Sequence, residues 1–233
     1  MTSLAIIFTI SITFIFPLIS FIYSYKQHRL KVFLLGGCAF IISQVILRLP
    51  LLSYLATHSV TYHQFQFDHI VLFSLFIGLS AGIFEEMTRF LFMTYLLKQQ
   101  RSFKDGLFFG FGHGGVEALI LVGIPLLVTL TSHNGAQLLG PTLFVSGIER
   151  FFSILLHVGL SIVVMWGVKE NKKGYLLLAI LIHTLTDSLI PILTQFTSQP
   201  VVFLEGVLII VSLSLFMFCL HLRKRWHINE KNS

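Results

Sequence analysis

The fold of this chain is decided by residues 69–97, HIVLFSLFIGLSAGIFEEMTRFLFMTYLL, a long apolar run that holds two adjacent glutamates and an arginine. A helix needs about 20 apolar residues to cross the hydrocarbon core of a bilayer, so this run predicts a membrane span. The same criterion predicts seven spans, at 2–25, 31–56, 69–97, 105–131, 145–168, 174–197 and 200–222. The first lacks a basic n-region and is long enough to span, so we expect no cleaved signal peptide there.

The composition agrees with an integral membrane protein. Of 233 residues, 55% are hydrophobic and only 11% are charged, whereas a soluble domain carries about 25% charged residues. The net charge of +6 comes without a long basic block, which argues against a nucleic-acid partner. Cys38 and Cys219 provide neither a disulfide framework nor zinc-finger spacing. We expect an all-α, multi-pass protein whose residues 1–233 form a single transmembrane domain.

The positive charges predict how the spans are oriented. Thirteen of the sixteen Lys and Arg residues lie between spans 1 and 2, 3 and 4, 5 and 6, or after span 7. The alternate loops, 57–68, 132–144 and 198–199, have none. The positive-inside rule then places the N-terminus outside and the C-terminus in the cytoplasm. No loop is long enough to carry a soluble domain, so any activity belongs to the bilayer or its surfaces.

Several ionisable residues lie inside the predicted spans, where they are costly and usually mark function. They are Arg48, Glu85, Glu86, Arg89, His113, Glu117, Glu149, Arg150, His157, His183 and Asp187. Counting from the cytoplasmic charges at 1.5 Å per residue places Glu85, Glu86, His113, His157 and His183 roughly 14–20 Å above the inner boundary. Four helices thus bring a carboxylate or an imidazole to one layer.

The spacing along each helix suggests partners for these groups. Residues at i and i+4 share a helix face, which pairs His113 with Glu117, His157 with Ser161, His183 with Asp187, and Glu85 with Arg89. With Arg89 compensating one carboxylate, the other could serve as a base. We interpret Arg48, Glu149 and Arg150, nearer the outer ends, as a structural ion-pair cluster.

Glycines predict which helices approach closely. Gly78 and Gly82 precede Glu85, and Gly106, Gly110 and Gly114 surround His113, each pair at GxxxG spacing. Small residues at this spacing let membrane helices meet backbone to backbone. We therefore expect spans 3 and 4 to pack together and to bring Glu85 and Glu86 toward His113.

Several classes of membrane protein lack support in the sequence. There is no HExxH of a zinc-dependent site-2 protease, no Gly-x-Ser-Gly of a rhomboid, and no Tyr-Asp with Gly-x-Gly-Asp of a presenilin. No lysine lies inside a span to form the Schiff base of an opsin-like pigment. A structural polar network and a proton or ion pathway remain open, although carriers are expected to show repeats and broken helices.

Four motifs resemble the signature of the CAAX-protease and bacteriocin-processing superfamily, which includes the PrsW-like proteases. They are Glu85-Glu86-Met87-Thr88-Arg89, Phe109-x-x-x-His113, His157, and His183-x-x-x-Asp187. The chain is most similar to the YhfC branch of intramembrane metalloproteases, with His113-Gly114-Gly115-Val116-Glu117 and Glu149-Arg150. The resemblance covers about residues 69–190, within a motif-bearing helical core at 69–197. CAAX endopeptidases commonly show EExxxR and a final Asn, where this chain has a closer Arg89 and Asp187.

The resemblance implies an intramembrane endopeptidase acting in the cytoplasmic half of the membrane on a membrane-embedded or membrane-associated peptide. Glu85 or Glu86 with His113 would activate water, and Arg89 would hold the second glutamate. His157 and His183 would stabilise an oxyanion or join His113 around zinc, and Asp187 completes the expected site. Zinc and a metal-free mechanism are both compatible with this set. The alternatives are a non-catalytic scaffold or immunity protein that binds a partner helix, and a proton or ion transporter. We expect the bacterial cytoplasmic membrane as its location.

Overall fold

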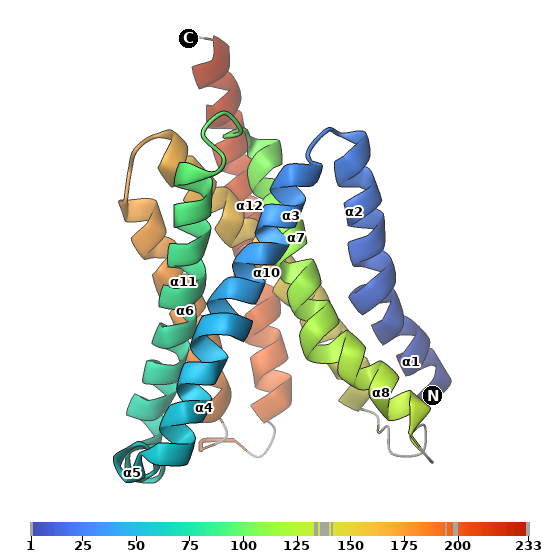
Figure 1. Ribbon diagram of the computed structural model, residues 1–233, viewed down its shortest axis with the longest axis vertical. Helices are drawn as coiled ribbons and strands as arrows, with labels where there is room; N and C mark the ends of the chain where they lie inside the picture. The colour runs from blue at the N-terminus through green and yellow to red at the C-terminus, as the bar shows by residue number, and fades with distance from the viewer. Residues whose placement is uncertain are drawn as a thin grey trace.

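A computed structural model describes residues 2–132, 135, 140, 142–193, 195–197 and 200–231. The described chain is a bundle of long helices with short connections (Figure 1). Within these residues, six helical stretches are long and apolar enough to cross a membrane: Ser3–Lys26, Leu30–His58, Ile70–Tyr95, Phe103–Thr131, Thr142–Lys169 and Val201–Trp226. A shorter apolar helix, Gly174–Leu189, lies at the sixth predicted span. The all-α expectation is confirmed, and the membrane orientation stays a prediction.

Three of the long helices contain a π-helical segment directly before a proline. The segments are η1 (Ser11–Ile15) between α1 (Thr2–Ile10) and α2 (Phe16–Lys26), η2 (Ile41–Arg48) between α3 (Leu30–Phe40) and α4 (Leu49–His58), and η3 (Leu119–Gly123) between α7 (Phe103–Ala118) and α8 (Ile124–Thr131). Pro17, Pro50 and Pro125 follow them. Proline removes one backbone donor and crowds the preceding turn, and a wider π turn accommodates it. The segment η2 is important for the site because it carries Gln44 and Arg48.

The remaining described elements are five helices, one of which lies at the centre of the bundle. They are α5 (Val60–Asp68), α6 (Ile70–Tyr95), α10 (Thr142–Lys169), α11 (Gly174–Leu193) and α12 (Pro200–Lys231). Residues 156–168 of α10 are all buried, so this helix forms the core of the bundle. The helices α1, α6, α7, α11 and α12 all contact it.

The glycines pack against different helices from those expected. Gly78 and Gly82 on α6 face Thr184 on α11, and Gly110 and Gly114 on α7 face α10. A side chain on Gly36 or Gly112 would collide with backbone of the opposite helix, so α3 and α7 also meet closely. The prediction that spans 3 and 4 pack through these glycines is therefore wrong. A GxxxG pattern indicates close approach, but it does not specify which helix fills the groove.

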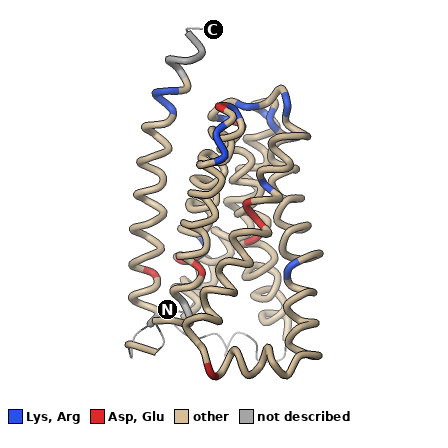
Figure 2. The backbone as a smooth tube through the Cα atoms, turned by 90° about the vertical axis from the view of Figure 1, so that its left-hand side faces the viewer, with Lys and Arg blue, Asp and Glu red and all other residues tan. Residues whose placement is uncertain are grey.

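The two ends of the bundle differ in charge. Lys and Arg gather at the end where α2 meets α3 and where α6 meets α7, whereas the end that carries α5 has almost none (Figure 2). We call these ends the basic end and the opposite end. The basic end matches the side that the positive-inside rule assigns to the cytoplasm.

Candidate active site

The helix α6 brings two adjacent carboxylates into the bundle, and their surroundings differ. Glu86 is fully buried, and both of its oxygens lie 2.5 Å from Nη1 of Arg89. Its Oε1 also lies 2.8 Å from Nδ1 of His183. A buried carboxylate needs such compensation because desolvation of an unpaired charge is costly. Arg89 therefore compensates the charge of Glu86, three residues before it. The spacing had suggested Glu85, four residues before it, as the partner of Arg89.

Glu85 is held by two neighbouring helices. Its Oε1 accepts a hydrogen bond from Nε2 of Gln44 on η2, and its Oε2 lies 2.8 Å from Nε2 of His113 on α7. Gln44 is itself ordered by Arg48, whose Nη1 donates to Gln44 Oε1 at 3.0 Å. The remaining Arg48 nitrogens donate to Ser80 Oγ and to the carbonyl of Ile77. Glu85 thus has a neutral amide and an imidazole as its hydrogen-bond partners, and no bidentate guanidinium.

The three predicted imidazoles come together from three helices. The ring centroids of His113 and His157 are 4.8 Å apart, and those of His157 and His183 are 5.4 Å apart. His157 Nε2 lies 2.5 Å from Oε2 of Glu117, while Nη2 of Arg89 lies 3.2 Å from His157 Nδ1. Because a guanidinium only donates, His157 accepts at Nδ1 and donates from Nε2 to Glu117. The convergence of Glu85, Glu86 and the three histidines is the arrangement that the sequence led us to expect.

The predicted i, i+4 partners of the histidines are mostly replaced by residues of other helices. His183 Nε2 lies 3.6 Å from Asp187 Oδ2, as the spacing suggested. Glu117, however, pairs with His157 rather than with His113, and the Ser161 hydroxyl has no hydrogen-bond partner among the described residues. In a helix bundle, a side chain can bond either to the next turn of its own helix or to a residue of a facing helix. For His157, the facing helix α7 provides the closer partner.

The expected ion-pair cluster of Arg48, Glu149 and Arg150 forms only in part, because Arg48 is not in it. Arg150 pairs with Glu149, and its Nη1 lies 2.7 Å from Glu117 Oε1. Arg48 instead bonds across α6, as described above. The interpretation of this trio as one structural unit is therefore wrong, because α10 and η2 lie on different sides of a cavity. Arg150 contacts Glu117, which is bonded to His157. Arg48 contacts Gln44, which is bonded to Glu85.

Two residues of this cluster, Gln44 and Glu117, are not in the site predicted from the sequence. Gln44 has no charge, yet its position four residues before Arg48 in an apolar span was a usable signal. The i, i+4 spacing pairs Glu117 with His113. In the structure its Oε1 also lies 3.2 Å from the hydroxyl of Ser153, so Glu117 contacts three residues of α10: Arg150, Ser153 and His157.

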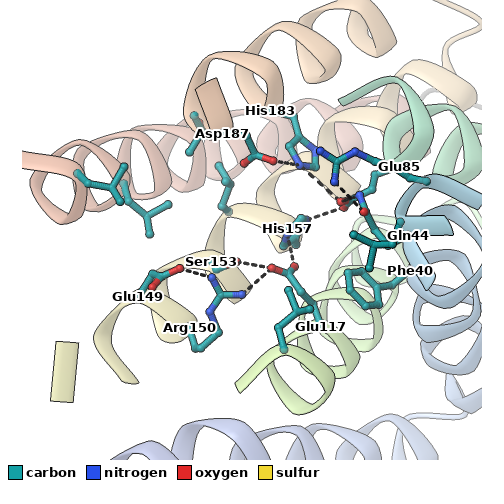
Figure 3. A pocket seen from close by; sticks show the side chains of 17 residues that line it. Phe40, Gln44, Glu85, Glu117, Glu149, Arg150, Ser153, His157, His183 and Asp187 are labelled. Atoms are coloured by element: carbon teal, nitrogen blue, oxygen red, sulfur yellow. Dashed lines mark hydrogen bonds and ion pairs between the residues drawn. The ribbon is translucent and has the colours of Figure 1, made fainter. Parts of the chain in front are cut away.

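A cavity of about 180 Å³ lies beside the cluster (Figure 3). Glu85, His157 and His183 form its polar wall together with Glu117, Arg150 and Asp187, and the figure shows these side chains meeting from different helices. Apolar side chains complete the lining: Phe40, Leu49, Leu121, Leu156, Leu204 and Leu208. Glu86, Arg89 and His113 lie behind this wall. A cavity of this kind can place water and a substrate carbonyl next to a carboxylate and imidazoles.

Part of the cluster has the chemistry of a metal site. Ligand atoms of Glu85, His113 and His157 lie within 4.8 Å of one another, and all three residues are buried. Two histidines and one glutamate form a common donor set of catalytic zinc. The Nδ1 atom of His113 is buried and has no hydrogen-bond partner among the described residues. These donor types fit a zinc ion, which would take the place of Arg89 at Nδ1 of His157, because Nε2 of that ring is bonded to Glu117. His183 lies outside the group.

Comparisons with known proteins agree with the membrane fold and the motifs. A family model described as YhfC intramembrane metalloprotease matches residues 10–139 and 131–213. The chain is 30% identical over 204 residues to "Uncharacterized membrane protein YhfC" of Bacillus subtilis (strain 168), which covers 75% of this chain and 78% of that relative. No solved structure matches the chain. It is a multi-pass membrane protein, and it belongs to the YhfC intramembrane metalloprotease family.

Proposed function

We propose that this protein is an intramembrane endopeptidase in which Glu85 and His113 activate a water molecule for attack on a peptide bond. The observation that carries the proposal is the position of Glu85. It lines the cavity, and its two oxygens are oriented by His113 and Gln44. A general base must lie within hydrogen-bond reach of the proton that it removes. Glu85 lines the cavity, and it also has one hydrogen-bond partner on η2 and one on α7.

The second glutamate has a different role in this proposal. Glu86 does not line the cavity, and Arg89 holds both of its oxygens. Glu86 positions His183 through its 2.8 Å contact with Nδ1. It therefore acts as a positioning residue, while Glu85 is the base.

The oxyanion of the tetrahedral intermediate needs hydrogen-bond donors aimed into the cavity. His183 lines the cavity between carboxylates of Glu86 and Asp187. A protonated imidazole donates from both ring nitrogens, and Nδ1 of His183 is already bonded to Glu86. We therefore assign Nε2 of His183 as the donor to the oxyanion, with the carboxylate of Asp187 beside it at 3.6 Å. In this arrangement, the carboxylate of Asp187 does not contact the oxyanion directly.

A zinc ion would be held by Glu85, His113 and His157. When bound, zinc acts as a Lewis acid toward a carbonyl and makes water a stronger nucleophile at neutral pH. The two options therefore differ in the task of Glu85, which accepts a proton in the metal-free form and holds the ion in the other. In both, Glu117 orients His157 and His183 faces the substrate.

The function is tested by comparing the membrane peptides of cells that produce the wild type or Glu85→Gln. We expect a fragment that only the wild type makes. Glu205→Gln is the matched control, because Glu205 is also a glutamate of a membrane helix but does not line the cavity. If cells with Glu85→Gln produce every fragment at normal protein levels, the protein is not a protease and the scaffold alternative is favoured.

A further inference from the structure

The cavity beside the cluster extends toward only one end of the bundle. On α10, the lining residues Glu149 and Arg150 precede His157 by about two turns and lie toward the opposite end. On α11, Asp187 follows His183 by one turn in the same direction. Leu204 and Leu208 lie near the start of α12, which is also at the opposite end. The cavity therefore extends from His157 and His183 toward the opposite end of the bundle.

The exposure of the charged side chains changes in the same direction. It is 38% for Asp187 and 31% for Glu149, then 6% for Glu85 and 0% for Glu86. A carboxylate that faced lipid at this depth would be costly, so exposed carboxylates inside a membrane protein face water-filled space. The gradient indicates that water enters from the opposite end and stops at the glutamate pair.

The path toward the basic end is closed by packed apolar side chains. Each motif-bearing helix has such a residue on the basic side of its polar group, and all are at most 1% exposed: Met93 on α6, Phe109 on α7, Leu160 and Val164 on α10, and Ala179 on α11. Interiors packed in this way have few voids larger than a water molecule. These packed side chains separate Glu85 from the basic loops.

We propose that Asp187, Glu149, Leu204, Leu208 and Leu49 form a water-filled vestibule through which the peptide substrate reaches Glu85 from the opposite end. By the positive-inside rule this end is extracytoplasmic, in contrast to the inward-facing site that the sequence led us to expect. The identification of the occupant as a peptide rests on the proposed function. The direction of access rests on geometry alone.

The polar wall of the cavity restricts the form of the peptide. In a helix, each backbone carbonyl is bonded to an N–H of the same helix. The wall can therefore bond to backbone groups only where the peptide is unwound. The vestibule accommodates an unwound, extended segment with apolar side chains against the leucines and backbone amides against the polar wall. The substrate class is a membrane-associated polypeptide with an unwound segment near the extracytoplasmic surface.

Thiol labelling from each face of the membrane tests the direction of access. In a Cys38→Ser, Cys219→Ala background, single cysteines replace Thr186 and Leu204, which line the cavity or its mouth. The exposed residues Gln64 and Lys172 provide markers of the opposite and basic ends. Ser161→Cys is the matched buried control, because the Ser161 hydroxyl is fully buried on the basic side of His157 and has no hydrogen-bond partner in the described part of the chain. The probe is a membrane-impermeant trimethylammonium methanethiosulfonate, applied to right-side-out and inverted vesicles.

We expect Thr186→Cys and Leu204→Cys to react from the same face as Gln64→Cys. They should react about tenfold or more faster than Ser161→Cys, since a buried thiol reacts only through local opening. Lys172→Cys should react from the other face. Protection of both vestibule cysteines from both faces overturns the proposal, as does reaction together with Lys172→Cys. Labelling requires no cleavage, so a labelled vestibule in a protein without peptidase activity would refute the proposed function and leave the access route standing.

Discussion

The Oε2 atom of Glu85 lies 2.8 Å from Nε2 of His113, which joins α6 to α7 although the glycines of these helices pack against α11, α10 and α3 instead. The two helices are held by shared neighbours, and their functional side chains meet across the space between them. A substitution of Glu85 or His113 therefore does not disturb a close backbone contact between α6 and α7. This relationship separates residues that carry the chemistry from residues that hold the bundle together.

The adjacent glutamates should differ in what they contribute to stability. Glu86→Gln leaves the buried Arg89 without its ion-pair partner, and breaking a buried pair costs about 3–5 kcal/mol. Glu85→Gln should change the free energy of unfolding by only about 1 kcal/mol, because an amide can still accept from Gln44 and contact His113. Unfolding in detergent measures both. Equal destabilisation by the two variants would contradict the distinct roles of the two side chains.

Zinc content should depend on the histidines unequally. The zinc-bound option predicts that the purified protein retains zinc and that His113→Ala and His157→Ala lose it, because each removes a ligand of the Glu85, His113 and His157 group. His183→Ala is the matched control and should keep the ion, since His183 bonds to Glu86 and Asp187 instead. Elemental analysis of the four proteins gives the answer. Loss of zinc in His183→Ala would mean that the ligand set is wrong.

Glu117 should affect activity through His157. Its carboxylate holds Nε2 of His157, and partners that orient such a ligand are typically worth about 10–100-fold in metal affinity or activity. Glu117→Gln should therefore lower the peptidase rate by a factor in that range. Ser153→Ala removes a contact to the other Glu117 oxygen and should have a smaller effect. Rates measured in proteoliposomes would contradict this role if both variants matched the wild type.

Close packing of α7 on α10 should be sensitive to one methyl group. A Cβ on Gly114 would lie 2.9 Å from Cα of Ile154 and 3.3 Å from Cβ of His157. Gly114→Ala must push α10 away, and overpacking of this kind costs about 1–3 kcal/mol. It should also lower activity by displacing His157.

The control for this substitution is Gly206→Ala on α12, where no atom lies within 4 Å of the added Cβ. Because alanine is the better helix former, this variant should be as stable as the wild type or slightly more stable. A Gly114→Ala protein with unchanged thermal unfolding and activity would show that the two helices can separate without consequence.

The sequence by itself determined that the chain is an all-α membrane protein and that Glu85, Glu86, His113, His157 and His183 belong to one layer. Both results follow from one-dimensional properties: the length of apolar runs needed to cross a bilayer, and the fixed rise per residue that converts position into depth. Because a charged group in lipid is costly, the ionisable residues inside the apolar spans could be recognised as candidate site residues.

Only the tertiary structure decided which residues are partners. Arg89 compensates Glu86, Glu117 holds His157, and Gln44 holds Glu85, and two of these three contacts join different helices. Depth along a helix says nothing about rotation around its axis or about which neighbour faces it, and GxxxG spacing did not identify the packing partner. The direction of the cavity was hidden for the same reason, because it depends on how apolar side chains from several helices close one end of the bundle.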